Sequence, residues 1–205
     1  MSETINKGSR LESLRVIDAS SDGQSVARID NAVVFIEGGV PGDLVDVEVY
    51  RKKKKFFEAR IVQIIEPSPD RRNPVCTHFG ICGGCKWQHM SYEKQLFYKQ
   101  QQVEQALVRI GKIEIPEIRT IIGSSKTEYY RNRLEFTFSN KRWLTKDEIG
   151  TDASAIEDVL GFHVPGRFDK ILDIQKCFLQ EDLSNEIRRA VKQFCVQEKY
   201  SFFDV

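Results

Sequence analysis

The sequence lacks the hydrophobic signals that direct a chain to a membrane. None of its apolar runs approaches the roughly 20 residues that a bilayer span needs. Its first ten residues are polar and do not contain the apolar core of a secretory signal. We therefore expect a cytoplasmic protein that has no membrane partner, and we expect it to be a monomer.

The chain has few cysteines and almost no net charge. Five cysteines in a cytosolic chain argue against a disulfide framework and favour metal ligation or thiol chemistry. The formal net charge is +1, but basic residues are in excess over residues 86–146 and acidic residues over 147–205. A basic middle fits a polyanionic partner, although such a surplus is also common on ordinary proteins.

The N-terminal third has the pattern of a small β-barrel. Residues 1–8 are expected to be a disordered lead-in, and residues 9–66 to contain five short strands. Val45, Val47 and Val49 alternate with polar residues and should share one buried face. Five strands in so short a segment favour an OB-like, five-stranded barrel. The expected strands are residues 16–18, 25–29, 32–36, 44–50 and 56–65.

A run of cations separates the last two expected strands and is followed by Phe56 and Phe57. Five adjacent positive charges repel one another and stay solvated, so the run is either a simple hairpin tip or a contact for an RNA backbone. At least one of the two rings should belong to the barrel core. The run consists of Arg51, Lys52, Lys53, Lys54 and Lys55.

Prolines in residues 67–75 interrupt regular structure, so we place a linker and the domain boundary there. Residues 76–205 have the pattern of a mixed α+β central domain, so the whole chain is predicted to be a β-barrel plus α+β. Apolar stripes predict helices whose inner faces pack on a core. The expected helices are residues 91–110 and 182–198; the expected strands are 118–122, 129–139, 143–144, 159–163 and 170–174; an insertion is expected at 146–158.

The most informative stretch is Cys76–His89, which reads C-T-H-F-G-I-C-G-G-C-K-W-Q-H. It contains three cysteines spaced C-x5-C-x2-C, and Cys177 is a distant fourth candidate. Thiolates suit zinc and iron–sulfur clusters equally well. A 3+1 arrangement with two glycines in the loop favours a cluster over zinc or no metal, because the glycines let backbone amides approach the sulfurs.

The remaining residues around this stretch have simpler expected roles. His78 and His89 flank the cysteines and are expected to make hydrogen bonds within the loop and not to be ligands. Cys195 falls on the apolar stripe of the second expected helix and should be a buried core thiol. If four cysteines are ligands and one is core, no cysteine is left for covalent catalysis.

Several motifs together resemble the iron–sulfur branch of the RNA uracil-C5 methyltransferase family, of the 23S ribosomal RNA type. They are the Pro-Ser-Pro-x-Arg segment Pro67–Arg71, the C-x5-C-G-G-C-x-x-Q-H stretch ending at His89, and Tyr130–Arg133, which is similar to a Y-R-N-R strand of that family. Gly39–Asp43 followed by a strand and a lysine run resembles the family's N-terminal TRAM domain. The resemblance covers about residues 10–205.

The resemblance implies a 4Fe-4S cluster held by Cys76, Cys82, Cys85 and Cys177. It also implies RNA binding, by Arg51–Lys55 in the barrel and by Tyr130, Arg131 and Arg133 in the central domain. For the two arginines, surface ion pairing is the ordinary alternative. Members of the family transfer a methyl group from S-adenosylmethionine to a uridine that is flipped out of its stack.

The sequence departs from the family where the chemistry is expected. It contains no G-x-G-x-x-G loop and no spare exposed cysteine, so no catalytic or S-adenosylmethionine-binding residue is assigned. We expect an N-terminal portion of a longer enzyme, inactive alone, that acts on ribosomal RNA or, as the runner-up, transfer RNA. A stand-alone RNA-binding module with a zinc or cluster staple is the alternative. A redox role ranks lower because no flavin or nicotinamide motif is present.

Overall fold

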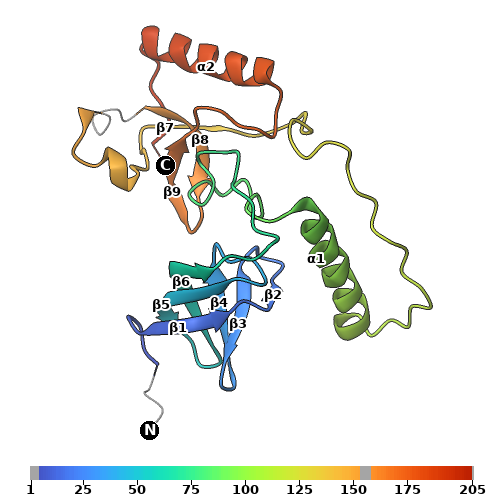
Figure 1. The fold of residues 1–205 in the computed structure, drawn as a ribbon. Coiled ribbons are helices and arrows are strands. Elements are labelled where there is room, and N and C mark those ends of the chain that lie inside the picture. Colours follow the sequence, from blue (N-terminus) through green and yellow to red (C-terminus); the bar gives the residue numbers. More distant parts are fainter. Residues whose placement is uncertain (1–4, 153–157, 205) are drawn as a thin grey trace. The chain divides into compact units, whose positions relative to one another are not determined.

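The computed structural model describes residues 5–152 and 158–204, and the chain divides into two compact units (Figure 1). Unit 1 consists of Met1–Asn73 and Lys86–Gly123, and unit 2 consists of Pro74–Cys85 and Ser124–Val205. These units differ from the expected ranges 9–66 and 76–205. The reason is that the chain segment after the cysteines packs with the N-terminal sheet, while the cysteines pack with the C-terminal half.

Unit 1 is built on one curled, mixed sheet of six strands, which replaces the expected five-stranded barrel. Its strand order is β1-β5-β6-β4-β3-β2. The β4–β6 pair is parallel and the other pairs are antiparallel. β1 also contacts β3 across the curl. The strands are β1 (Arg10–Arg15), β2 (Asp18–Ala19), β3 (Ser25–Ile29), β4 (Ala32–Glu37), β5 (Leu44–Lys52) and β6 (Phe56–Glu66).

The core of this sheet confirms the alternation seen in the sequence. Val45, Val47 and Val49 are completely buried, and the polar residues between them face the other way. Phe57 is also in the core, whereas Phe56 stacks edge-on against Phe35 with ring centroids 5.3 Å apart. The expectation that at least one of the two rings belongs to the core is therefore confirmed.

Strand β1 was not expected, and a bulge explains why. Leu11 and Leu14 are both buried although they are three residues apart, a spacing that does not fit the period of two in a regular strand. The pairing with β5 shifts between these two leucines, and Ser13 has a φ of 54°. The extra residue turns Leu14 back to the core side.

Helix α1 (Tyr92–Gln105) and a π-helical turn, η1 (Ala106–Ile110), complete unit 1. Ser91 precedes the helix, and Gly111 follows the turn, as expected. Tyr98 packs with Ala19, Val40 and Met90 in a small second core. The apolar face expected from the sequence is instead largely exposed, since Val103 is 53% and Ile110 83% exposed.

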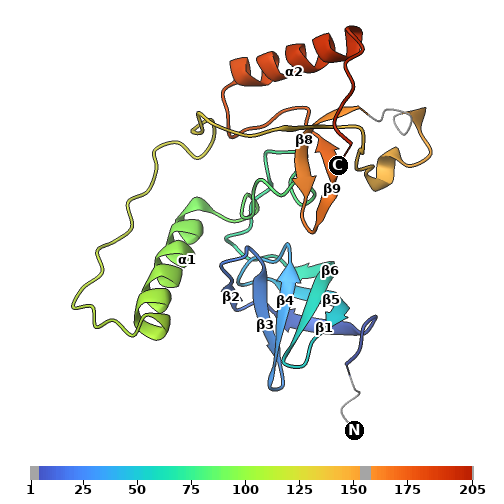
Figure 2. The ribbon, with the colours of Figure 1, turned by 180° about the vertical axis from the view of Figure 1, so that it is seen from behind.

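Unit 2 contains a small antiparallel sheet and a helix, seen from the opposite side in Figure 2. The sheet order is β7-β8-β9. Its elements are β7 (Thr137–Ser139), the 3-10 turn η2 (Lys146–Glu148), β8 (Val159–Val164), β9 (Arg167–Asp173) and α2 (Asp182–Gln197). The strands expected near residues 159–163 and 170–174 are confirmed, and so is the second helix.

Other expectations for the chain after Gly111 are wrong. Residues 112–136 contain no helix or strand, so the strand at 118–122 is absent and the one at 129–139 shrinks to β7. Part of the alternating pattern instead pairs with Phe178 and Leu179, whose carbonyls accept from the amides of Tyr129 and Arg131 at 2.7 and 2.8 Å. Near residues 143–144 there is one isolated bridge, from Arg142 to Ile171. The expected insertion lies partly at 153–157 and the lead-in partly at 1–4, outside the described residues.

Helix α2 is oriented opposite to the expectation. Its apolar stripe is exposed, whereas Asn185 and Arg188 on the other side are buried. Cys195 is only half-buried, so the prediction of a buried core thiol is wrong. The inner face is polar because it hydrogen-bonds the backbone beside Cys177. The exposed stripe consists of Leu183 (66%), Ile187 (56%), Val191 (44%) and Phe194 (54%).

Candidate functional site

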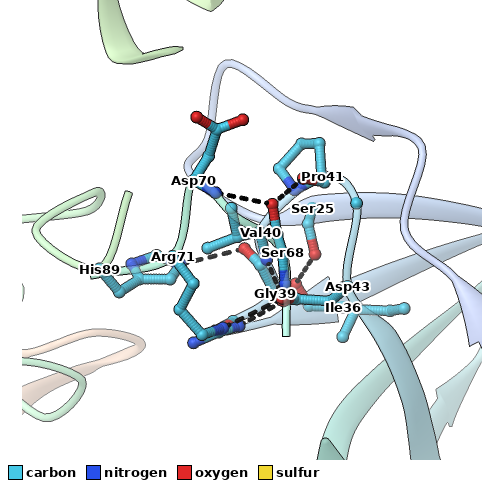
Figure 3. A network of polar contacts seen from close by, with 12 residues as sticks. Ser25, Ile36, Gly39, Val40, Pro41, Asp43, Ser68, Asp70, Arg71 and His89 are labelled. Carbon is cyan, nitrogen blue, oxygen red and sulfur yellow. Dashed lines mark hydrogen bonds and ion pairs between the residues drawn. The ribbon is translucent and has the colours of Figure 1, made fainter. Parts of the chain in front are cut away.

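A buried carboxylate, Asp43, organises the loop after β4 in unit 1 (Figure 3). Its oxygens accept hydrogen bonds from the backbone amides of Val40 at 2.7 Å and Ser68 at 2.8 Å. Arg71 adds an Nε–H bond at 3.1 Å and an ion pair through Nη2. Burial by itself raises the pKa of Asp43, but the hydrogen bonds from Arg71, Ser68 and Val40 outweigh it, so the pKa lies below its usual value.

This arrangement joins two of the sequence motifs, Gly39–Asp43 and Pro67–Arg71. Ser68 Oγ donates to the Pro41 carbonyl at 2.8 Å, and Arg71 Nη2 donates to the Gly38 carbonyl at 2.8 Å. The end of the cysteine stretch joins as well, because His89 Nε2 lies 3.0 Å from the Gly39 carbonyl. His89 therefore makes a hydrogen bond, as expected, but its partner is the loop after β4 and not the cysteine loop.

The four candidate metal ligands all lie in unit 2. Cys177 is buried at 8% exposure and belongs to a hydrophobic cluster against which Cys82 and Cys85 pack. Cys76 is close enough to Cys177 for the two thiols to interact electrostatically. The 3+1 ligand set stays a prediction.

The cysteines are costly to ionise in this site without a counter-charge. Burial raises the pKa of Cys82 to about 11; the Gly84 N–H opposes this shift, and the neighbouring Cys85, Cys76 and Cys177 thiolates add to it. Burial likewise raises the pKa of Cys76. A bound cation reverses this balance, because a coordinating thiol is deprotonated outright.

Two glycines shape the cysteine loop. The Gly84 N–H points at Cys82 Sγ at 3.3 Å, which is the amide–sulfur approach expected from the Gly-Gly pair. A Cβ on Gly83 would lie 3.3 Å from the His163 carbonyl oxygen and 3.3 Å from Pro165 Cγ. Gly83 therefore lets the loop pack tightly against the hairpin between β8 and β9.

His78 ties the cysteine loop to the turn that carries Cys177. Its Nε2 accepts a hydrogen bond from the backbone amide of Gln175 at 3.0 Å. Burial lowers the pKa of His78, which favours the neutral ring that such an acceptor requires. His78 therefore makes a hydrogen bond, as expected, but its partner is the turn after β9 and not its own loop.

The donor groups of this region are thiols. Within residues 5–152 and 158–204, no three Cys, His, Asp or Glu side chains are placed as ligands of one metal ion. Thiolates are ligands of zinc and of iron–sulfur clusters alike, and an amide directed at a sulfur is a feature of cluster sites.

The candidate RNA-binding residues lie in both units. Arg51 forms an ion pair with Glu58 at 3.3 Å, and Lys52 Nζ donates to the Ile5 carbonyl at 2.6 Å. Both are therefore engaged within unit 1. Lys53, Lys54 and Lys55 are exposed at the turn between β5 and β6.

In unit 2, the Tyr130–Arg133 segment is irregular and not the strand that the sequence favoured. Tyr130 is 53% exposed, and the Arg131 guanidinium lies 6.0 Å from its ring centre. Arg133 pairs with Glu135 at 2.7 Å on the surface, which matches the alternative of surface ion pairing. A solvated pair of this kind contributes little to stability.

The sequence did not point to four of the residues that shape these sites. Asp43 and Arg71 both stand in motifs that were recognised, but nothing in the sequence pairs them. Asn185 and Arg188 are polar residues on the buried side of α2, opposite its apolar stripe. Their spacing of three residues, which puts both on one face of the helix, is the signal that could have identified them.

Comparison with known proteins identifies the domain type of the N-terminal sheet. Residues 12–62 match the model of the TRAM domain. The match runs from β1 into β6, so the TRAM domain includes the sheet core, Asp43 and the run Arg51–Lys55. The expected TRAM domain is thereby confirmed.

Similar proteins extend the match to nearly the whole chain. A Bacteroides thetaiotaomicron protein described as an uncharacterized RNA methyltransferase is 52% identical over 187 residues, or 91% of this chain and 41% of the relative. A Porphyromonas gingivalis protein with the same description is 50% identical, over 94% of this chain and 43% of the relative. The chain thus spans about two fifths of the length of the curated relatives it matches.

A solved structure shows the same likeness at the level of the fold. It is the Pyrococcus abyssi tRNA (uracil-54, C5)-methyltransferase in complex with S-adenosyl-L-homocysteine. The likeness has a TM-score of 0.55 with 26% sequence identity, and it covers 94% of this chain and 39% of that chain. No helix among the described residues is long and apolar enough to cross a membrane.

Proposed function

We propose that this chain is the RNA-recognition and iron–sulfur portion of an S-adenosylmethionine-dependent RNA (uracil-C5-)methyltransferase. The observation that carries the proposal is that one chain contains a TRAM match and a three-cysteine loop, of which Cys82 and Cys85 pack against the cluster that holds Cys177. The descriptions of the relatives and of the structural neighbour support the same activity. We expect the catalytic cysteine and the methyl-donor site to lie outside these residues.

The ligands of the proposed 4Fe-4S cluster are Cys76, Cys82, Cys85 and Cys177. When bound, the cluster supplies a covalent cross-link between the cysteine loop and the turn after β9. The chain's own residues prepare this link: Gly83 allows the close packing, Gly84 directs its amide at Cys82, and His78 holds the turn. The role is thus structural, and it keeps the Tyr130–Arg133 segment beside the Phe178–Leu179 backbone.

The exposed lysines between β5 and β6 are the part of the run Arg51–Lys55 with the freest access to RNA. We predict that changing Lys53, Lys54 and Lys55 together to alanine weakens RNA binding and flattens its salt dependence. Each lost phosphate contact reduces the slope of log K against log salt by about 0.7 for a single strand, so three contacts reduce it by about 2. Fluorescence anisotropy with a labelled RNA at several salt concentrations measures both quantities.

A matched charge change provides the control. Arg167, Lys170 and Arg189 of unit 2 are changed to alanine in the same background. We expect RNA binding to stay close to that of the unaltered chain. An equal loss of affinity in both triple variants would show a non-specific charge effect and would contradict a TRAM contact at the Lys53–Lys55 turn.

Ribosomal RNA is our first choice of target, because the cysteine motif resembles the 23S ribosomal RNA enzymes. The alternative is transfer RNA, which is favoured because the structural neighbour is a transfer RNA methyltransferase. Competition between a 23S fragment and transfer RNA for this chain distinguishes them. With labelled S-adenosylmethionine and either RNA, we expect no methyl transfer by the chain alone; transfer would overturn the expected place of the catalytic residues.

A further inference from the structure

Arg188 is a cation buried in unit 2 without an acidic partner. It is 7% exposed, and its guanidinium donates to neutral oxygens: the Ile174 carbonyl, the Gln175 carbonyl at 3.0 Å and Asn185 Oδ1 at 3.2 Å. Across residues 5–152 and 158–204, no carboxylate lies within ion-pair distance of it, and its Nε has no hydrogen-bond partner. An isolated charge of this kind is unfavourable in a protein interior.

The groups around Arg188 do not supply a full counter-charge. Asp173 acts on it electrostatically, but that carboxylate is paired with Lys192 at 2.7 Å. The Phe136 ring lies 5.0 Å from the guanidinium carbon and offers a cation–π contact. Cys177 is the remaining group that favours the charge, and it is a candidate metal ligand.

The same side of α2 holds the backbone of Cys177. Asn185 is 3% exposed; its Oδ1 accepts from the Cys177 amide at 2.7 Å, and its Nδ2 donates to the Cys177 carbonyl at 3.0 Å. Asn185 Oδ1 also accepts from Arg188, so the two side chains form one hydrogen-bonded unit. Neither interaction uses the Cys177 sulfur.

Gln175 links this unit to the other three ligands. The backbone carbonyl of Gln175 accepts a hydrogen bond from Arg188 at 3.0 Å, and its backbone N–H donates to His78 in the cysteine loop at 3.0 Å. The turn from Ile174 to Cys177 is therefore held on one side by α2 and on the other by the loop that carries Cys76, Cys82 and Cys85.

We propose that Asn185 and Arg188 form a clamp that positions Cys177 for the metal centre, and that the charge of Arg188 offsets the negative charge of that centre. The inference rests on the proposed cluster. Four thiolates leave a 4Fe-4S cluster with net negative charge, which becomes more negative on reduction. A buried cation beside it therefore stabilises the assembled cluster and stabilises the reduced form most. Asn185 and Arg188 are positioning residues, since neither is a proposed ligand of the cluster.

The test compares variants of the 205-residue chain purified without oxygen and reconstituted with iron and sulfide. Arg188→Met removes the charge, Arg188→Lys keeps it, and Arg189→Met is the control on the exposed side of α2. Iron per chain is measured after a fixed time in air, and the reduction potential by dye-mediated titration with dithionite. Asn185→Ala tests the hydrogen bonds to Cys177 separately.

We expect Arg188→Met to retain less than half the iron of the wild type. We also expect its reduction equilibrium constant to fall by at least tenfold, which is about 59 mV for a one-electron couple. Arg188→Lys should recover most of both values, and Arg189→Met should match the wild type. Asn185→Ala should lose iron, while its remaining cluster keeps a potential near that of the wild type.

The outcomes separate this inference from the proposed cluster. Equal iron and equal potential in Arg188→Met and the wild type overturn the charge role and leave the cluster standing. Equal losses in Arg188→Met and Arg188→Lys also overturn it, because charge then does not decide the effect. Unchanged iron in Asn185→Ala overturns the clamp. Zinc in place of iron, still lost in Arg188→Met, rejects the cluster but supports the Arg188 role, and a chain that binds neither metal rejects both.

Discussion

Asp43 shows how one buried charge can set the conformation of several loops. It is completely buried, yet it accepts from two backbone amides and from Arg71, so its negative charge is well satisfied. Removing one partner of such a pair leaves the other charge buried alone. The stability of unit 1 should therefore depend on Asp43 more than on any surface ion pair of the same unit.

We predict that Asp43→Asn lowers the free energy of unfolding of unit 1 by about 3 kcal/mol, at the low end of the range for a broken buried pair because Arg71 remains partly solvated. The chain offers a clean probe, because its two tryptophans, Trp87 and Trp143, lie in different units. In a Trp143→Phe background, urea unfolding followed by Trp87 fluorescence reports on unit 1. Glu12→Gln, which alters an exposed carboxylate, should change the result by less than about 0.5 kcal/mol; a similar loss in both variants would contradict this role for Asp43.

The stability that Asp43 provides should also disappear in acid. Because the folded-state pKa of Asp43 lies below its unfolded value, the ionised side chain stabilises unit 1 above the unfolded pKa, about 4. This stability is lost as the pH falls through the lower folded pKa. The difference in unfolding free energy between wild type and Asp43→Asn should thus be largest near pH 7 and shrink below about pH 4. A difference that is constant from pH 7 to pH 3 would rule out this ionisation as its source.

At this scale the sequence predicted residue types better than it predicted partners. The four cysteines were identified by spacing, and Cys82 and Cys85 pack against the hydrophobic cluster that contains Cys177. The contacts Asp43–Arg71 and Asn185–Cys177 were missed, because each joins positions that no local pattern relates. Burial of a polar side chain follows from the hydrogen bonds it makes after folding, and a hydropathy pattern carries no information about them.

At the scale of elements, the errors have identifiable physical causes. The bulge at Ser13 puts Leu11 and Leu14 on one side and breaks the period of two, so β1 went unrecognised. Residues 129–136 alternate like a strand. Tyr129 and Arg131 instead pair with the short Phe178–Leu179 segment through isolated backbone bonds. In both places the backbone partner decided what structure formed.

Helix α2 gives the clearest test of an element's orientation. Its polar inner face holds Cys177, so its apolar stripe is exposed. We predict that Ile187→Glu changes the unfolding free energy of unit 2 by less than about 0.5 kcal/mol, as for an ordinary surface change. Trp143 fluorescence in a Trp87→Phe background measures it. Leu172→Glu, at a residue 4% exposed, is the buried comparison and should abolish cooperative unfolding. A loss of several kcal/mol for Ile187→Glu would mean that the stripe packs on a core.

At the scale of the whole molecule, the chain passes back and forth between two units. The cysteine loop Pro74–Cys85 belongs to unit 2 although the residues on both sides of it belong to unit 1. The proline-rich segment expected to be a simple linker contributes Ser68 and Arg71 to the Asp43 network. The proline content located the segment that connects the two expected domains. The hydrogen bonds that the segment makes determine which unit it belongs to.

The proposed activity also depends on the whole molecule. The TRAM match and the descriptions of the relatives point to RNA and to methyl transfer, while the cysteine site is what distinguishes an iron–sulfur protein from other TRAM proteins. The central claim is therefore the cluster at Cys76, Cys82, Cys85 and Cys177. It would supply the counter-charge that Cys76 and Cys82 need, because burial raises the pKa of both thiols, and it would explain the buried cation Arg188 beside Cys177.

The most direct test is the iron and acid-labile sulfide content of the chain after purification without oxygen. We predict about four iron and four sulfide per chain for the wild type, since four thiolates match a 4Fe-4S cluster. Cys177→Ser should lose most of the iron and unfold at a lower temperature, whereas Cys195→Ser should keep both near wild type. Zinc without sulfide in the wild type, or unchanged iron in Cys177→Ser, would contradict the account.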